Sequence, residues 1–124
     1  MAIKPISKLD IANPLASSHG ETVYELIGRA AEHGGVHEHS LAYITLAPGK
    51  ASLPHYHRLS QESYYLLKGT ATMWVDGEEY PLSAGQALVI LPNQRHQIAN
   101  PGTTELEFLA VCVPAWYPED SFYE

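Results

Sequence analysis

The stretch "PHYHRLSQESYYLLKG" at residues 54–69 places histidine and glutamate side chains inside a segment that otherwise has the apolar character of a β-strand. His55 and His57 are separated by one residue, so in a strand they point to the same face about 6.6 Å apart along the backbone. Imidazole nitrogens at this spacing can converge on one ion at roughly 2.1 Å. We therefore predict that His55 and His57 bind one metal ion.

Glu62 is the third candidate ligand in this stretch. It lies an odd number of positions from His57, so in an unbroken strand its side chain would point to the opposite face. The intervening residues 58–61, "RLSQ", are polar and suited to a turn or bulge. We expect the chain to bend there, after which Glu62, Tyr64 and Leu66 face inward.

The best candidate for a fourth ligand is His96, which follows the turn signal "PNQR" and opens the short strand "HQIAN". Asn93 stands in that turn, where a positive φ is tolerable for asparagine. Cys112 is the only cysteine, so a metal site within one chain must rest on histidine and carboxylate side chains. Cys112 itself lies in the apolar run "LAVCVP" and is expected to be a small buried hydrophobe.

Segments with β-strand composition recur at short intervals and are separated by turn residues, which predicts an all-β sandwich or barrel. Asp76-Gly77 is a type I′ turn signal and predicts a hairpin. The segment 28–35, "GRAAEHGG", is short and ends in two glycines, so a loop is favoured there over a helix. The predicted strands are residues 22–28, 40–47, 62–69, 71–77, 78–83, 86–92, 96–100 and 106–114.

Residues 49–69 read G-x5-H-x-H-x4-E-x6-G, which resembles the first motif of the cupin superfamily without a departure. Residues 85–100 resemble the second motif, G-x5-P-x-G-x2-H-x3-N, with Leu91 in place of its proline and Asn93 in place of its turn glycine. Both departures concern the turn and leave the histidine in place. The two motifs together span about two fifths of the chain.

The resemblance implies the cupin fold, an all-β jelly-roll β-barrel also described as a double-stranded β-helix. It also implies one divalent transition metal inside the barrel, and the alternative is a metal-free barrel with a polar interior. Imidazole and carboxylate ligands suit Fe, Mn, Ni, Cu or Zn, and the sequence does not select among these metals. Carried over by position, the ligands are His55, His57, Glu62 and His96.

At 124 residues and 45% hydrophobic composition, the chain is predicted to form a single cupin domain over residues 1–124. Its formal net charge of -7 argues against a nucleic acid or an anionic membrane surface as the partner. The first twenty residues lack the apolar core of a signal peptide, and no segment approaches the roughly 20 apolar residues of a membrane span. A cytoplasmic protein that binds a small molecule is therefore expected.

Three further features bear on function. Tyr64 is expected to face inward near Glu62, where its hydroxyl could act catalytically, although core packing is an equal alternative. His37 and His39 repeat the spacing of the first pair, but they lie in a glycine-rich loop without an obvious third ligand, so a solvated loop is favoured. The aromatic tail at 114–124 is expected to fold back on a barrel or to cross to a partner, and strands that are apolar on both faces favour a homodimer.

The resemblance supports several activities, because cupins include dioxygenases, decarboxylases, isomerases, epimerases and non-catalytic binding barrels. An octahedral ion held by four side chains keeps two positions open for water, substrate or dioxygen. Only Arg29, Arg58 and Arg95 are available to bind a phosphate at the pocket rim, so a small neutral or weakly anionic substrate is favoured. We predict a metal-dependent enzyme of dioxygenase type, with an isomerase, epimerase or decarboxylase of a sugar or small acid, or a non-catalytic sensor barrel, as alternatives.

Overall fold

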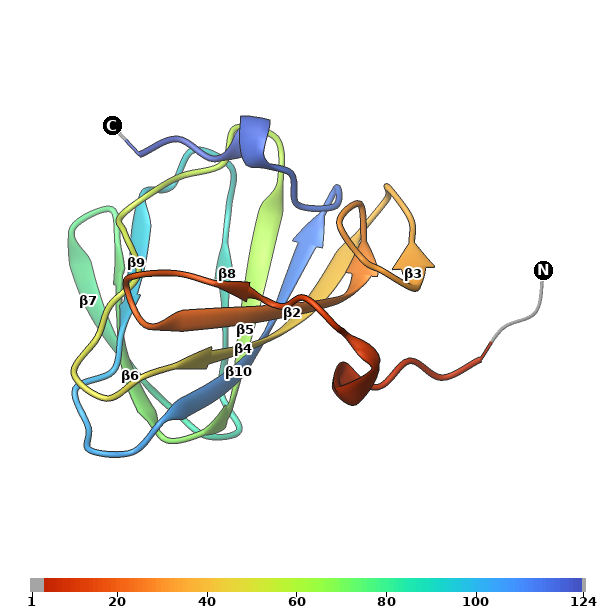
Figure 1. The fold of residues 1–124 in the computed structure, drawn as a ribbon. Coiled ribbons are helices and arrows are strands. Elements are labelled where there is room, and N and C mark those ends of the chain that lie inside the picture. Colours follow the sequence, from red (N-terminus) through yellow and green to blue (C-terminus); the bar gives the residue numbers. More distant parts are fainter. Residues whose placement is uncertain (1–3, 124) are drawn as a thin grey trace.

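The computed structural model describes residues 4–123, which form strands and two short 3-10 turns and contain no α-helix (Figure 1). All eight predicted strands are present, each within two residues of its predicted ends, and two strands of two residues were not predicted. None of the described helical segments is long and apolar enough to cross a membrane. The elements are η1 (Lys8–Asp10), β1 (Leu15–Ala16), β2 (Glu21–Gly28), β3 (Gly34–Gly35), β4 (Ser40–Leu46), β5 (Gln61–Lys68), β6 (Thr70–Val75), β7 (Glu78–Ser83), β8 (Ala87–Ile90), β9 (His96–Ala99), β10 (Leu106–Val113) and η2 (Pro118–Asp120).

The strands form two sheets that enclose the interior as a jelly-roll β-barrel, which confirms the predicted fold (Figure 1). The larger sheet has the order β1-β2-β4-β10-β5-β8, and the smaller sheet has the order β7-β6-β9. β3 pairs in parallel with the end of β2, whereas the other strand pairs are antiparallel.

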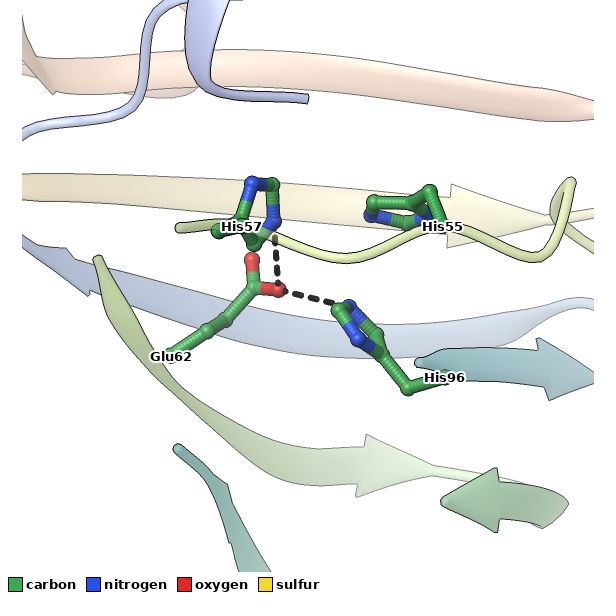
Figure 2. A group of neighbouring side chains, drawn as sticks. All are labelled: His55, His57, Glu62 and His96. Atoms are coloured by element: carbon green, nitrogen blue, oxygen red, sulfur yellow. Dashed lines mark hydrogen bonds and ion pairs between the residues drawn. The ribbon is translucent and has the colours of Figure 1, made fainter. Parts of the chain in front are cut away.

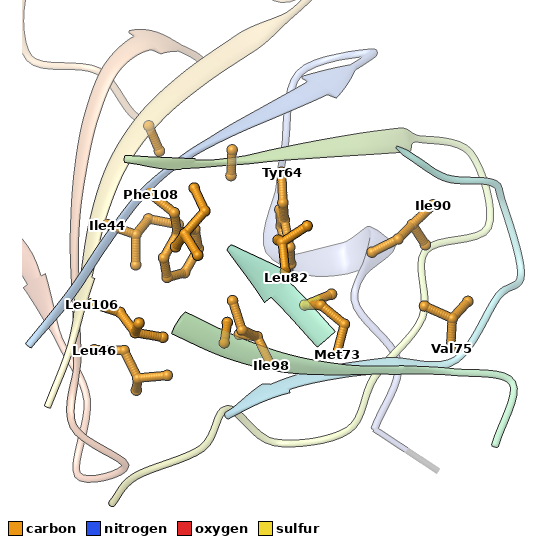
Figure 3. Packing of buried hydrophobic residues seen from close by; sticks show 14 residues of the cluster. Ile44, Leu46, Tyr64, Met73, Val75, Leu82, Ile90, Ile98, Leu106 and Phe108 are labelled. Atoms are coloured by element: carbon orange, nitrogen blue, oxygen red, sulfur yellow. The ribbon is translucent and has the colours of Figure 1, made fainter. Parts of the chain in front are cut away.

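The interior is filled at one end and hollow at the other because the inward side chains of β4 and β10 change in size along each strand. Leu46, Leu106 and Phe108 are almost fully buried in the apolar core (Figure 3). Further along the same inward rows, Ala42 and Ala110 are small, and both line the cavity described below. Large residues therefore close one end of the barrel, and small residues leave room at the other.

The turns adopt the backbone conformations that the sequence predicts. Asp76 and Gly77 have φ angles of 51° and 82°, as a type I′ hairpin requires, and they join β6 to β7. Asn93 has a φ of 70°, so asparagine serves where the family motif has glycine. Residues 28–35 contain no helix, as expected, but only 29–33 form a loop, because Gly28 ends β2 and Gly34–Gly35 form β3.

The aromatic tail folds back on its own barrel, which is one of the two arrangements predicted for it. The Phe122 ring stacks on Tyr56 with centroids 5.3 Å apart, and the guanidinium of Arg58 lies over the same Phe122 ring, 4.2 Å from its centroid. Trp116 donates a hydrogen bond from its indole to Ser121. The tail therefore covers the segment that carries His55 and His57.

Candidate metal centre

The structure brings the four predicted ligands together at one place in the barrel (Figure 2). One ligand atom from each residue lies within 4.8 Å of the others, and in the described residues this is the only cluster of its kind. Three of the four are buried, and His55 is partly exposed. The four residues are His55, His57, Glu62 and His96.

Backbone pairing holds the ligands from separate segments side by side. His55 and His96 form an isolated antiparallel bridge, with N···O distances of 3.0 and 2.8 Å. Asn93 donates from its backbone amide to the carbonyl of His57 at 2.6 Å, which ties the turn before His96 to the first histidine pair. Glu62 is the second residue of β5 and follows a bend at residues 58–59, and the bend was predicted.

Each histidine ring is oriented by a backbone carbonyl that lies within hydrogen-bond distance of its Nδ1. The partners are Leu53 for His55, Asp120 for His57 and Gln94 for His96, each at 2.9 Å. A ring that donates from Nδ1 presents the lone pair of Nε2, which is the form required of a metal ligand. All three imidazoles are thus held in the same tautomer with Nε2 available.

The distances between the ligand atoms fit a bound cation. The Nε2 atoms of His57 and His96 lie 3.4 and 3.2 Å from Oε1 of Glu62, and adjacent ligands at ~2.1 Å from one ion are about 3.0–3.4 Å apart. Nε2 of His57 is also the one buried side-chain nitrogen or oxygen in residues 4–123 that has no hydrogen-bond partner. Imidazole lone pairs and a carboxylate at this distance repel one another unless a proton or a metal ion lies between them, so the residues present could hold a metal ion.

The surroundings keep Glu62 ionised. Burial alone would raise the pKa of its carboxyl, but the contacts with His57 and His96 outweigh burial and hold this pKa below its usual range. Cys112 lies against the other carboxylate oxygen, with Sγ donating to Oε2 at 3.3 Å. Burial, followed by the charge of Glu62, raises the pKa of the Cys112 thiol, which therefore remains a neutral hydrogen-bond donor. Burial, followed by the proximity of His96, lowers the pKa of His55 to about 4.

The cluster forms part of the wall of a cavity of about 350 Å³. Tyr64 also lines this cavity, and its ring packs against Phe108 with centroids 5.4 Å apart, so it belongs both to the cavity and to the core. Burial, followed by the charge of Glu62, raises the pKa of the Tyr64 hydroxyl well above its usual value. The hydroxyl of Tyr64 consequently stays protonated at neutral pH, where it is a hydrogen-bond donor and not a ready base.

The loop carrying His37 and His39 contributes nothing to this cluster. Both residues are exposed, and Nδ1 of His37 lies 3.4 Å from a guanidinium nitrogen of Arg29. The described residues contain no second group of metal-ligating side chains around them. The structure therefore agrees with the preference for an exposed loop.

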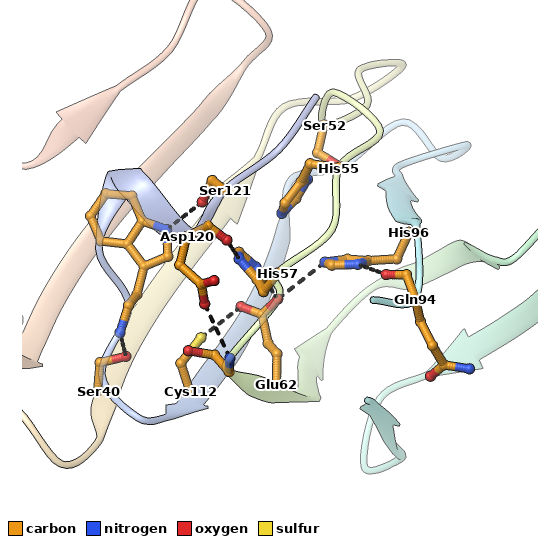
Figure 4. A network of polar contacts seen from close by, with 12 residues as sticks. Ser40, Ser52, His55, His57, Glu62, Gln94, His96, Cys112, Asp120 and Ser121 are labelled. Carbon is orange, nitrogen blue, oxygen red and sulfur yellow. Dashed lines mark hydrogen bonds and ion pairs between the residues drawn. The ribbon is translucent and has the colours of Figure 1, made fainter. Parts of the chain in front are cut away.

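Asp120 is a residue at the site that the sequence reasoning missed (Figure 4). Its buried carboxylate accepts hydrogen bonds from the backbone amides of Arg58, Leu59 and Ser60 at 3.0 to 3.1 Å, and its own carbonyl orients His57. These contacts join positions about sixty residues apart. An acidic residue in the tail therefore shapes the bend between two metal-ligand candidates.

Two relatives of named function resemble parts of this chain. The chain is 36% identical over 72 residues to the oxalate-binding protein of Thermotoga maritima, which covers 58% of this chain and 60% of that protein. It is 40% identical over 48 residues to quercetin 2,3-dioxygenase of Bacillus subtilis, which covers 39% of this chain and 14% of that enzyme. These matches span only part of each named protein.

Longer matches and a family model define the family. The chain is 30% identical to the uncharacterized protein MJ1618 of Methanocaldococcus jannaschii over 93% of this chain and 90% of that one. A crystal structure of a protein from Planctomyces limnophilus superposes with a TM-score of 0.77 at 28% identity, covering 98% of this chain and 97% of that one. The model of the cupin domain matches residues 42–112. This chain therefore belongs to the cupin family.

Proposed function

We propose that this cupin is a mononuclear metal-dependent enzyme that acts on a small organic molecule, with a dioxygenase as the first choice. The observation that carries the proposal is the convergence of three imidazoles and one carboxylate, of which His55, His57 and Glu62 line a cavity. Nε2 of His57 supports it, because a buried nitrogen without a partner is the atom that a metal would satisfy. The match to quercetin 2,3-dioxygenase supports the choice of reaction class.

Different residues of the protein would bind the metal ion and bind the substrate. His55, His57, Glu62 and His96 would hold the ion, which when bound supplies open coordination positions and, as Fe(II), one-electron chemistry. Tyr64 would donate a hydrogen bond to the substrate from its protonated hydroxyl. The apolar walls of the cavity would exclude water around the reacting groups.

An oxygen electrode tests the reaction class. Protein reconstituted separately with Fe(II), Mn(II), Ni(II) or Cu(II) should consume oxygen with at least one compound in a panel of flavonols, catechols and small organic acids. Absence of substrate-dependent oxygen uptake with all four metals would contradict the dioxygenase assignment.

A non-catalytic binding barrel is the second candidate function, and the match to the oxalate-binding protein supports it. Titration calorimetry with oxalate tests this candidate.

Tyr64→Phe separates an enzyme from a binding barrel. The substitution removes one hydroxyl and keeps the ring against Phe108, so the core should remain packed. For an enzyme we expect turnover to fall by about a hundredfold, the low end for the loss of one hydrogen-bond donor that stabilises a transition state, with metal content unchanged. Steady-state kinetics beside elemental analysis measures both, and unchanged turnover would assign Tyr64 to packing alone.

We also propose that the chain forms a homodimer through the outer face of its larger sheet. Tyr65, Leu67, Val89 and Val113 are exposed on the neighbouring strands β5, β8 and β10, which form a more continuous apolar surface than a monomer normally leaves uncovered. Multi-angle light scattering should give twice the mass of 13.7 kDa for the wild type and the monomer mass for Val89→Asp. Leu9→Asp, at an exposed leucine outside this sheet, should remain dimeric. A wild-type monomer across a wide concentration range would contradict the proposal.

A further inference from the structure

β2 places two carboxylates in the cavity that holds the metal-ligand cluster. Glu21 and Glu25 pair with Leu46 and Ala42 of β4, which are both inward-facing residues, and directly opposed residues of antiparallel strands share a face. Both glutamates line the cavity, as does Glu62. The cavity therefore holds three carboxylates.

The two glutamates of β2 differ in what their carboxylates contact. Glu25 is buried and accepts a hydrogen bond from the backbone amide of Ala30 at 2.7 Å, so it holds the loop that follows β2. Among the described residues, no hydrogen bond or ion pair engages the carboxylate of Glu21, which is only partly buried. Burial raises the pKa of Glu21, His19 lowers it, and the charge of Glu62 raises it, so Glu21 lies within electrostatic reach of both His19 and the metal-ligand cluster.

No lysine or arginine side chain balances these carboxylates, although His19 also lines the cavity and interacts with Glu21. All seven lysine and arginine residues lie in the described part of the chain, and none lines the cavity. Arg29 donates to the carbonyl of Ala115 and lies over Tyr117, and Arg58 lies over Phe122, so two of the three arginines are engaged with the tail. Away from the ion, a phosphate or carboxylate group beside Glu21 and Glu25 would meet negative charge without a lysine or arginine to compensate it.

The other residues that line the cavity are largely apolar. Val23, Ile44 and Ala110 line the cavity from the inward faces of β2, β4 and β10, and Trp116 of the tail also contributes. A ligand that fills this space needs an apolar body and, near Glu21, a group that donates a hydrogen bond. Hydroxyl groups meet that requirement and carry no charge.

We propose that Glu21 is a substrate-binding residue that accepts a hydrogen bond from a hydroxyl group and makes the cavity selective for neutral hydroxylated compounds over phosphorylated or carboxylated ones. This inference rests on the proposed metal-dependent function, because the substrate would bind between Glu21 and the ion.

The test compares two probes that differ only by a carboxylate. Catechol and 3,4-dihydroxybenzoate are titrated into Co(II)-loaded protein, and binding is followed by the change in the Co(II) absorption bands. The wild type should bind catechol at least about tenfold more tightly, because a carboxylate on the probe is repelled by Glu21 at short range in a partly desolvated site. In Glu21→Gln the ratio of the two dissociation constants should fall to about threefold or less.

Two controls make the result specific. Glu105→Gln changes the net charge equally at an exposed position and should keep the wild-type ratio. The Co(II) content of each sample is measured first, so a wild type that takes up no metal would contradict the proposed function itself. With metal bound, equal affinities for the two probes, an unchanged ratio in Glu21→Gln, or no spectral response to catechol would each overturn the role assigned to Glu21.

Discussion

Replacing His96 by alanine should remove most of the metal from the purified protein. His96 is almost fully buried, its Nδ1 is held by the carbonyl of Gln94, and its Nε2 lies 3.2 Å from Glu62. The substitution deletes one of four convergent ligands and leaves a cavity that no neighbouring histidine can fill. Loss of an outer-shell partner already weakens metal binding by about 10- to 100-fold, so loss of a ligand should weaken it by more than about a hundredfold.

Elemental analysis of protein purified without chelators measures this effect. The wild type should hold close to one transition metal per chain, and His96→Ala should hold a small fraction of that. His37→Ala is the matched control, because it removes an imidazole from an exposed loop outside the cluster. Metal should also raise the melting temperature of the wild type, since a ligand that binds only the folded state stabilises it. A full metal content in His96→Ala, or a deficit in His37→Ala, would place the site elsewhere.

The strands and the positions of the candidate ligands could be predicted because the information is local. Alternation of apolar residues marks strands, and Asp76-Gly77 encodes its own hairpin. The odd spacing between His57 and Glu62 required a bend, and the structure has one at residues 58–59. The spacing within a motif therefore predicts how the ligands are arranged when these ligands are close in the sequence.

The parts of the site that could not be predicted depend on contacts between distant segments. Asp120 is one acidic residue in a polar tail, and nothing local indicates that its carboxylate reaches the bend near His57. Glu21 lies at the start of an ordinary amphipathic strand, and its position in the cavity depends on the register of β2 against β4. The hydrogen bond from Cys112 to Glu62 likewise follows from the pairing of β10 with β5. Strand register is a property of the folded barrel, and the side-chain pattern of one strand does not define it.

Asp120→Ala should destabilise the bend that precedes Glu62 and weaken metal binding together. The buried carboxylate accepts from three successive backbone amides, of Arg58, Leu59 and Ser60, and its removal leaves all three donors without this partner. An unsatisfied buried donor costs about 1–3 kcal/mol, and partial access of water to the bend reduces the sum, so we expect a loss of about 3 kcal/mol in the free energy of unfolding. Metal affinity should fall by about tenfold or more, because the same bend orients His57 and Glu62.

Urea denaturation of the metal-free protein and a metal titration of the folded protein measure the two effects separately. Asp120→Asn keeps one acceptor oxygen and should lose less than half as much stability, whereas Glu119→Ala, at the exposed neighbouring residue, should match the wild type in both measurements. The carbonyl that orients His57 is a backbone atom and persists in every variant. Any loss of metal affinity in Asp120→Ala therefore reports the position of the bend and not the loss of that carbonyl. A stable Asp120→Ala protein with wild-type affinity would show that residues 58–60 hold the bend without the tail, and the C-terminal segment would then have no part in the metal centre.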